Sequence, residues 1–269
     1  MKSLVVLVTA LALLLAIDAA AESVGYVSET NHGERSVLTI DSPRPVAAVI
    51  RALASDYGHL VTYEDPWYED RDDMIDATDA VHVDAPESLV PDDQRLIVPR
   101  GGAFKLEFDN RTPTAGIVQA TLDVASELNP TLVFRISQKK GYTHVIAYAA
   151  RNRDGTLVMQ RSLLDTPISF ASRPRTAGEY VEVIKQTLAA TAKVTIVDGT
   201  FLYDLGVRGD PGLKKYSSVA DHEPARDVLR RALIAIAVDR GPMSWQLIYN
   251  PTWRHTPFML NLIPVSRRN

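Results

Sequence analysis

Two similar stretches near opposite ends of the chain decide the fold: Pro45-Val46-Ala47-Ala48-Val49-Ile50-Arg51 and Pro224-Ala225-Arg226-Asp227-Val228-Leu229-Arg230. Each places a proline where a helix begins, because the first helical residue has no need of its N–H. Each then leads through a predicted strand to an aromatic-proline turn: Tyr63, Pro66 and Trp67 in the first copy; Tyr249, Pro251 and Trp253 in the second. The pattern indicates a chain built from small similar modules.

Periodicity divides the rest of the chain into short elements. We expect strands at 37–40 and 60–63 around the first helix, and a loose polar leader at 22–34. A second unit has a strand at 104–108, a helix after Thr112-Pro113, and strands at 132–137, 142–149 and 156–159. The third begins with the capping box Thr176-Ala177-Gly178-Glu179. It continues with strands at 194–197, 245–249 and 258–263, and a polar excursion at 203–222 precedes its second helix.

These units predict an α+β fold of tandem small strand-helix-strand(-strand) modules packed together, with mixed or antiparallel sheets. We expect a first module with the acidic loop over 22–100, a central α+β module over 101–172, and a C-terminal module over 173–269 that repeats the first motif. Each module is too small to bury much apolar surface alone, so the modules should pack against one another.

The N-terminus is typical of a cleavable signal peptide over residues 1–21. Lys2 carries a positive charge, Leu4 to Ile17 is apolar except for Thr9, and Ala19-Ala20-Ala21 offers small residues for cleavage. The alternative is a membrane anchor, but the apolar run is shorter than the roughly 20 residues that span a bilayer. We therefore expect a periplasmic or secreted protein without a transmembrane segment after processing. The chain has no cysteine, which excludes disulfides and thiol chemistry.

An acidic stretch lies within the first module. Residues 64–95 carry twelve acidic side chains against two basic ones, within a net charge of −4. This balance argues against a nucleic-acid partner. Four of its carboxylates are candidate calcium ligands: Asp70, Asp72, Asp73 and Asp76. The spacing lacks the glycine of an EF-hand loop, so a solvated acidic loop or a site for a basic protein partner are the alternatives.

No motif for catalysis or for a cofactor is found. Ser137 and Lys140 match S-x-x-K in spacing, but they fall at a predicted hairpin turn rather than on a helix. We therefore expect no catalytic residue, no cofactor and no metal beyond the weak calcium candidates. Aromatic residues near the repeated turns belong either to the core or to an interface, and the interface candidates are Trp67, Tyr68 and Trp253.

The residues from Leu38 to Tyr63 resemble the short N-terminal module shared by secretins and TonB-dependent receptors. The resemblance is carried by ten positions: Ile40, Pro45, Val46, Val49, Ile50, Leu53, Ala54, Gly58, Val61 and Tyr63. A more divergent copy covers Val194 to Val265, and the layout is similar to that of uncharacterised exported bacterial proteins with such a module near each end. The resemblance implies a periplasmic docking or signalling element without catalytic residues.

Three functional hypotheses follow from these observations. The first is a non-enzymatic periplasmic interaction protein whose partner is another envelope protein. The second is a periplasmic protein that binds a small ligand or carbohydrate between modules. The third, ranked below these, is a hydrolase, which would need two carboxylates in a cleft with one pKa raised by burial. The oligomeric state is not predicted.

Overall fold

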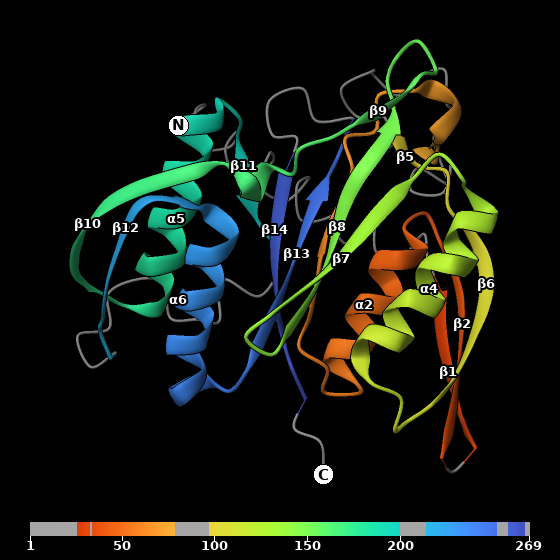
Figure 1. Ribbon diagram of the computed structural model, residues 1–269, viewed down its shortest axis with the longest axis horizontal. Coiled ribbons are helices and arrows are strands. Elements are labelled where there is room, and N and C mark those ends of the chain that lie inside the picture. Colours follow the sequence, from red (N-terminus) through yellow and green to blue (C-terminus); the bar gives the residue numbers. More distant parts are fainter. Residues whose placement is uncertain (1–25, 33, 79–96, 200–213, 252–257, 267–269) are drawn as a thin grey trace, which may run out of the picture.

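A computed structural model describes residues 26–32, 34–78, 97–199, 214–251 and 258–266. The fold is α+β, with helices packed against mixed and antiparallel sheets. Figure 1 shows five layers side by side: a two-stranded ribbon, a helix pair, a central sheet, a second helix pair and a three-stranded sheet. The predicted signal peptide lies outside the described residues. No helix among those residues has the length and apolar character needed to cross a membrane.

The first half of the chain folds around one face of the central sheet. Its core elements are β2 (Arg35–Ser42), α2 (Pro45–Ser55), β3 (Val61–Glu64), β6 (Gly102–Asp109), α4 (Thr114–Leu128), β7 (Val133–Lys139) and β8 (Tyr142–Arg151). Strand β2 pairs with β6, β3 runs parallel to β8, and β7 is antiparallel to β8. Short additions complete this half: β1 (Tyr26–His32), η1 (Arg71–Asp73), β4 (Met74–Asp76), β5 (Ile97–Pro99) and β9 (Leu157–Met159).

The second half repeats this plan on the other face. After η4 (Leu163–Asp165) come β10 (Pro167–Arg175), α5 (Ala177–Ala192), β11 (Ile196–Asp198), β12 (Tyr216–Pro224), α6 (Ala225–Arg240), β13 (Met243–Tyr249) and β14 (Phe258–Pro264). Strand β10 pairs with β12, β11 runs parallel to β14, and β13 is antiparallel to β14. The pairings match those of the first half element for element, which identifies an internal duplication.

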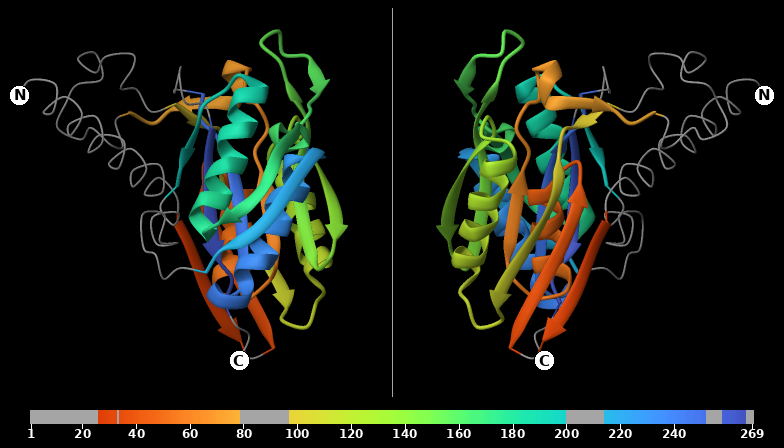
Figure 2. Two further views of the ribbon diagram at one scale, coloured as in Figure 1. Left: turned by 90° about the vertical axis from the view of Figure 1, so that its left-hand side faces the viewer. Right: turned by 90° about the vertical axis from the view of Figure 1, so that its right-hand side faces the viewer.

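The two halves share one central sheet in the order β11-β14-β13-β3-β8-β7. Because β13 runs parallel to β3, the equivalent strands keep their order but reverse their direction. Such a reversal turns the second half over, so its helices cover the opposite face, as the side views show (Figure 2). Strand β13 serves both cores: Met243, Trp245 and Leu247 face the second half, whereas Ile248 faces the first.

Local sequence explains the elements that were predicted correctly. Val46, Val49, Ile50 and Leu53 are all buried on one side of α2, and Gly58, with φ of 68°, ends the segment as expected. Thr176 accepts a hydrogen bond from the Glu179 N–H, and the Glu179 side chain accepts one from the Thr176 N–H, so the capping box is confirmed. Ser137 lies on β7 and Lys140 in the following turn, which confirms the predicted hairpin.

Other expectations need correction. The expected loose leader contains β1, and the end of the expected polar excursion is β12. Strand β10 had no sequence prediction, because its glycine-free run of serines, arginines and prolines lacks a clear apolar alternation. The predicted segments 22–100 and 101–172 share their sheets, since β2 pairs with β6 and β3 with β8. The duplication therefore matches α2 with α5 and α4 with α6, not the helix at Pro45 with the helix at Pro224.

Candidate functional site: a cavity beside Asp65

Two consecutive buried carboxylates point into opposite halves: Glu64, the last residue of β3, and Asp65, which follows it directly. Glu64 accepts hydrogen bonds from Arg226 on α6, with Nε–Oε1 of 2.6 Å and Nη2–Oε2 of 2.5 Å. The Ser162 hydroxyl also donates to Glu64, and the other Arg226 nitrogen donates to Asp165. Because neighbouring residues of a strand face opposite sides, Asp65 turns to the first half. The two side chains thereby fasten the halves together.

Asp65 is the centre of the network on the first-half side. Its carboxylate accepts from Arg44 Nε at 2.8 Å, from the Tyr63 hydroxyl at 2.6 Å, from the Tyr68 hydroxyl at 3.1 Å and from the Tyr249 backbone N–H at 3.0 Å. Arg44 also donates to the Tyr249 carbonyl at 2.7 Å. The Asp65 carboxylate thus pairs with the buried guanidinium, and its other acceptor positions are occupied by hydroxyl and backbone donors.

The electrostatics of this cluster follow from burial and from Asp65. Burial, and next the charge of Asp65, raise the pKa of both Tyr63 and Tyr68 well above the usual value. Burial alone would lower the pKa of Arg44, but Asp65 outweighs it, so this pKa is raised. Both hydroxyls therefore stay protonated at neutral pH and remain committed to Asp65. They are hydrogen-bond donors in a fixed frame, and neither is a base.

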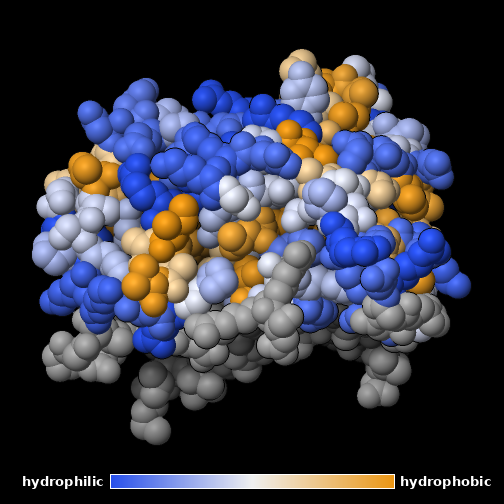
Figure 3. Space-filling view, turned by 60° about the horizontal axis from the view of Figure 1, so that its bottom comes forward, coloured by the Kyte–Doolittle hydropathy of each residue, from blue (hydrophilic) through white to orange (hydrophobic). Residues whose placement is uncertain are grey.

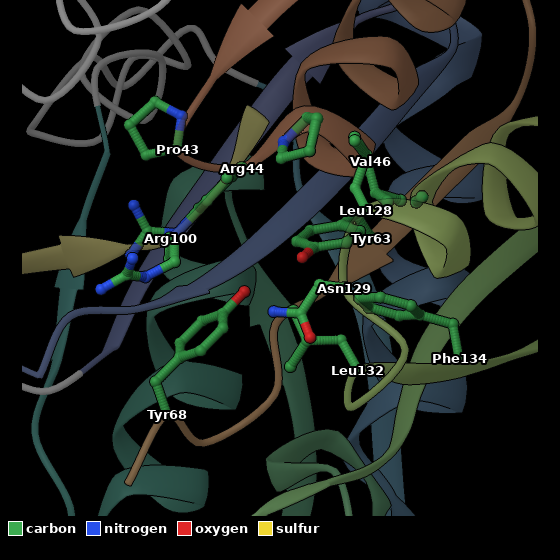
Figure 4. A pocket seen from close by; sticks show the side chains of 13 residues that line it. Pro43, Arg44, Val46, Tyr63, Tyr68, Arg100, Leu128, Asn129, Leu132 and Phe134 are labelled. Atoms are coloured by element: carbon green, nitrogen blue, oxygen red, sulfur yellow. The ribbon is translucent and has the colours of Figure 1, made fainter. Parts of the chain in front are cut away.

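A small cavity of about 30 Å³ opens beside this cluster. Figure 4 shows Arg44 and Arg100 on one side of it, Leu128, Leu132 and Phe134 on the other, and the rings of Tyr63 and Tyr68 between them. The remaining lining residues come from the start of α2, the β5–β6 link and the end of α4: Pro43, Pro45, Val46, Gly101, Ala125 and Asn129. The volume holds one or two water molecules, or the end of one apolar side chain.

Backbone packing fixes one wall of the cavity. A Cβ added to Gly101 would lie 1.9 Å from the Ser42 carbonyl oxygen and 2.6 Å from Pro43. Only glycine allows these two chain segments to approach so closely. Arg100, just before it, is exposed, and no described carboxylate forms an ion pair with it, in contrast to Arg44. The site therefore combines an apolar and aromatic interior with a cation at its rim, Arg100, that pairs with no carboxylate of the described ranges.

The predicted calcium residues do not converge. Asp70 and Asp73 are buried and bind Arg151, with Asp73 Oδ1 at 2.6 Å and Asp70 Oδ2 at 3.3 Å from its nitrogens. Asp72 and Asp76 are exposed, and Asp76 accepts a hydrogen bond from the Thr78 N–H. Within the described ranges, no three His, Cys, Asp or Glu side chains are grouped as metal ligands. The part of the acidic stretch that is described is folded around arginines rather than solvated throughout.

The predicted interface aromatics have different environments. Tyr68 is buried and lines the cavity. Trp67 is half-buried: its ring lies 5.4 Å from that of Tyr249 and 4.9 Å from that of Phe258, and Gln160 bonds both its N–H and its carbonyl. Trp253 lies outside the described residues. Sequence reasoning missed Arg44, Arg151 and Arg226, because their carboxylate partners are remote in sequence and no local pattern connects them.

Comparisons of this chain with known protein families, with curated proteins and with solved structures returned no match. The resemblance to the secretin and TonB-dependent receptor module therefore stays a prediction.

Proposed function

We propose that this protein is an exported, non-enzymatic binding protein that recognises another envelope protein through the cavity beside Asp65. The observation that carries the proposal is an apolar cavity with Arg100 at its rim, where no carboxylate that the structure describes pairs with this cation. An apolar side chain of the partner would enter among Leu128, Leu132 and Phe134. A neighbouring carboxylate of the partner would then pair with Arg100, which is the charge complement that this rim supports.

The dimensions favour this occupant over the alternatives. A cavity of about 30 Å³ accepts part of one side chain, whereas pockets for whole small ligands occupy roughly 300–1,000 Å³. Hydrolysis finds less support, because the buried carboxylate Glu64 and its neighbour Asp165 both bond Arg226 instead of facing a cleft. Asp65 is likewise held by four donors. These carboxylates stabilise the fold and are not placed to transfer protons to a substrate.

Site-specific photocrosslinking in intact cells tests the proposal. A photoreactive residue at Asn129, which lines the cavity, should yield a discrete crosslinked partner. The same residue at Val238, which is 76% exposed on α6, is the matched control and should not yield that band. Arg100→Glu should abolish the Asn129 crosslink without lowering the melting temperature. An unchanged crosslink in Arg100→Glu, or the same band from both positions, would overturn the proposal.

A further inference from the structure

The second half contains a buried arginine, Arg175, with no carboxylate partner in the part of the chain that the structure describes. Arg175 ends β10, directly before Thr176, the N-cap of α5, and is only 4% exposed. Strand β10 pairs with β12, and this ribbon packs against α5 and α6, which it crosses in the left view of Figure 2. A buried guanidinium normally has an anionic partner, since removing a cation from water is costly. No described carboxylate forms an ion pair with Arg175.

Its hydrogen bonds leave one edge of the guanidinium open. Nη1 donates to the Arg173 carbonyl at 3.4 Å and to the Ser218 carbonyl at 3.5 Å, and Nη2 donates to the Ala171 carbonyl at 3.1 Å. Nε has no hydrogen-bond partner among the described residues, and Nη2 carries a second hydrogen. Nε–H and this second Nη2–H form a fork of two parallel donors. That fork matches two oxygens of a carboxylate or a phosphate.

Two further buried hydroxyls are close by, those of Tyr180 and Ser218. Neither has a partner at hydrogen-bonding distance among the described residues, although Arg231 approaches the Tyr180 hydroxyl, which in part raises the pKa of Arg231. Ser218 belongs to the strand paired with β10, where it lies opposite Arg173. The Phe170 ring connects the others, because Arg175 Cζ lies 5.0 Å from its centre and Tyr180 packs against its edge at 6.3 Å. Buried donors without a partner at hydrogen-bonding distance among the described residues thus come from three neighbouring side chains, Arg175, Ser218 and Tyr180, and each such group needs an explanation.

The surrounding charge also favours an anion. Burial, and next the neighbouring Arg173, lower the pKa of Arg175, and Tyr180 and Glu179 only partly offset them. Glu179 is committed to the Thr176 N–H, Arg231 is paired with Glu223, and Lys215 adds positive charge near Glu179. The start of the 16-residue helix α5 contributes its positive dipole end.

We propose that Arg175, Ser218 and Tyr180 form a binding site for a small oxyanion, a carboxylate or a phosphate, at the β10–β12 ribbon. The guanidinium fork takes two oxygens, and the two hydroxyls donate to the same group. The site belongs to the second half and shares no residue with the cavity beside Asp65. It therefore stands or falls independently of the proposed partner binding.

Thermal unfolding of the whole mature protein at constant ionic strength tests this site. Sodium phosphate should raise the melting temperature in a saturable manner, whereas sodium chloride should not, and sodium acetate shows whether a carboxylate suffices. Arg175→Gln should lose the phosphate-dependent rise. Arg173→Gln, which removes the exposed neighbouring charge, should keep it. Equal shifts with chloride and phosphate, or a retained shift in Arg175→Gln, would overturn the proposal.

A second measurement does not depend on the variant's folding. In the ¹H–¹⁵N spectrum of the wild-type protein, the Nε–H resonance of Arg175 should move with phosphate concentration and reach a plateau. The resonances of exposed arginines such as Arg173 should move little. A Nε–H resonance of Arg175 that is insensitive to phosphate and acetate would contradict the site.

Discussion

The two halves each place an arginine just before their first helix, and they treat its charge differently. Arg44 precedes Pro45 of α2 and is neutralised by Asp65 within a frame of two tyrosine hydroxyls. Arg175 precedes Thr176 at the start of α5. Among the described residues it donates to three backbone carbonyls and lies over an aromatic ring, near the hydroxyls of Ser218 and Tyr180. The same order of elements thus yields a buried arginine with a carboxylate partner in the first half. In the second half it yields a buried arginine with no such partner among the described residues.

The comparison shows how a duplicated fold can separate structural from functional roles. Asp65 comes from the segment that follows β3, and the equivalent segment after β11 begins with Gly199, which packs against Asn261. Within the described residues, the second half supplies no acid at the corresponding place. Arg175 therefore has no carboxylate partner among the described residues, whereas Arg44 is held by Asp65 in the core.

The largest expected effect comes from removing the carboxylate that pairs with Arg44. Asp65→Asn removes the negative charge that offsets Arg44 and leaves a buried guanidinium uncompensated. Breaking a buried pair in this way costs about 3–5 kcal/mol. Urea denaturation of the purified variant measures the loss. A loss below 1 kcal/mol would mean that Asp65 is not the main partner of Arg44.

The next effect concerns the pKa of His144, which is buried near positive charge on the second-half face of the sheet. Burial, then Arg226, Arg230 and Lys139, lower the pKa of His144 to about 4 from 6.5, and Asp227 only partly opposes them. The unfolded state therefore binds more protons between these values, so stability should fall by about 3 kcal/mol as the pH drops from 6.5 to 4.

His144→Gln should remove this part of the pH dependence, whatever its effect on stability at pH 8. The measurement is the free energy of unfolding of both proteins at several pH values in this window. Other titrating groups contribute equally to both proteins, so the difference isolates His144. Parallel curves for the two proteins would show that the His144 pKa is not lowered.

A smaller effect tests how tightly the first half closes around Arg44. Gly101→Ala places a methyl group against the Ser42 carbonyl and should cost about 1–3 kcal/mol through backbone displacement. Gly102→Ala is the matched control, because its Cβ would meet only the flexible Leu128 side chain at 3.4 Å. Thermal unfolding of both variants compares them. Similar melting temperatures would mean that this wall can relax.

The smallest effect belongs to an exposed ion pair. Arg35 Nη1 on β2 lies 3.1 Å from Glu107 Oε1 on β6, and the two side chains are 70% and 58% exposed. Since water screens such pairs, Glu107→Ala should change stability by no more than about 0.5 kcal/mol. Urea denaturation of Glu107→Ala and of Asp65→Asn under the same conditions compares the two losses in the free energy of unfolding. A loss approaching that of Asp65→Asn would show that burial does not decide which ion pairs matter here.

The sequence predicted the elements better than their assembly. Helix α2 and the capping box of α5 follow from local spacing and from the N-cap chemistry of Thr176, which need no knowledge of distant residues. The match of α2 with α5 was missed because α2 begins with proline and α5 with a capping box. Local start signals therefore paired the helix at Pro45 with the helix at Pro224 instead.

The candidate sites were less predictable for a physical reason. The carboxylates at positions 65 and 73 read as part of a solvated acidic run, yet each is buried against an arginine supplied by another element, Arg44 before α2 and Arg151 on β8. The composition of a segment shows how many charged side chains it has, but not which distant residues pair with them. The open edge of Arg175 is equally invisible in sequence, because it depends on which backbone carbonyls β10 and β12 present.

The contrast between the two arginines is tested most directly by the free energies of unfolding of Arg44→Met and Arg175→Met in phosphate-free chloride buffer. We expect Arg44→Met to lose about 3–5 kcal/mol, because Asp65 is left buried without its cation. Arg175→Met should stay within about 1 kcal/mol of wild type, or gain stability, because no buried carboxylate loses its partner. Equal large losses in both variants would contradict the distinction between Arg44, which has a buried carboxylate partner, and Arg175, which has none among the described residues.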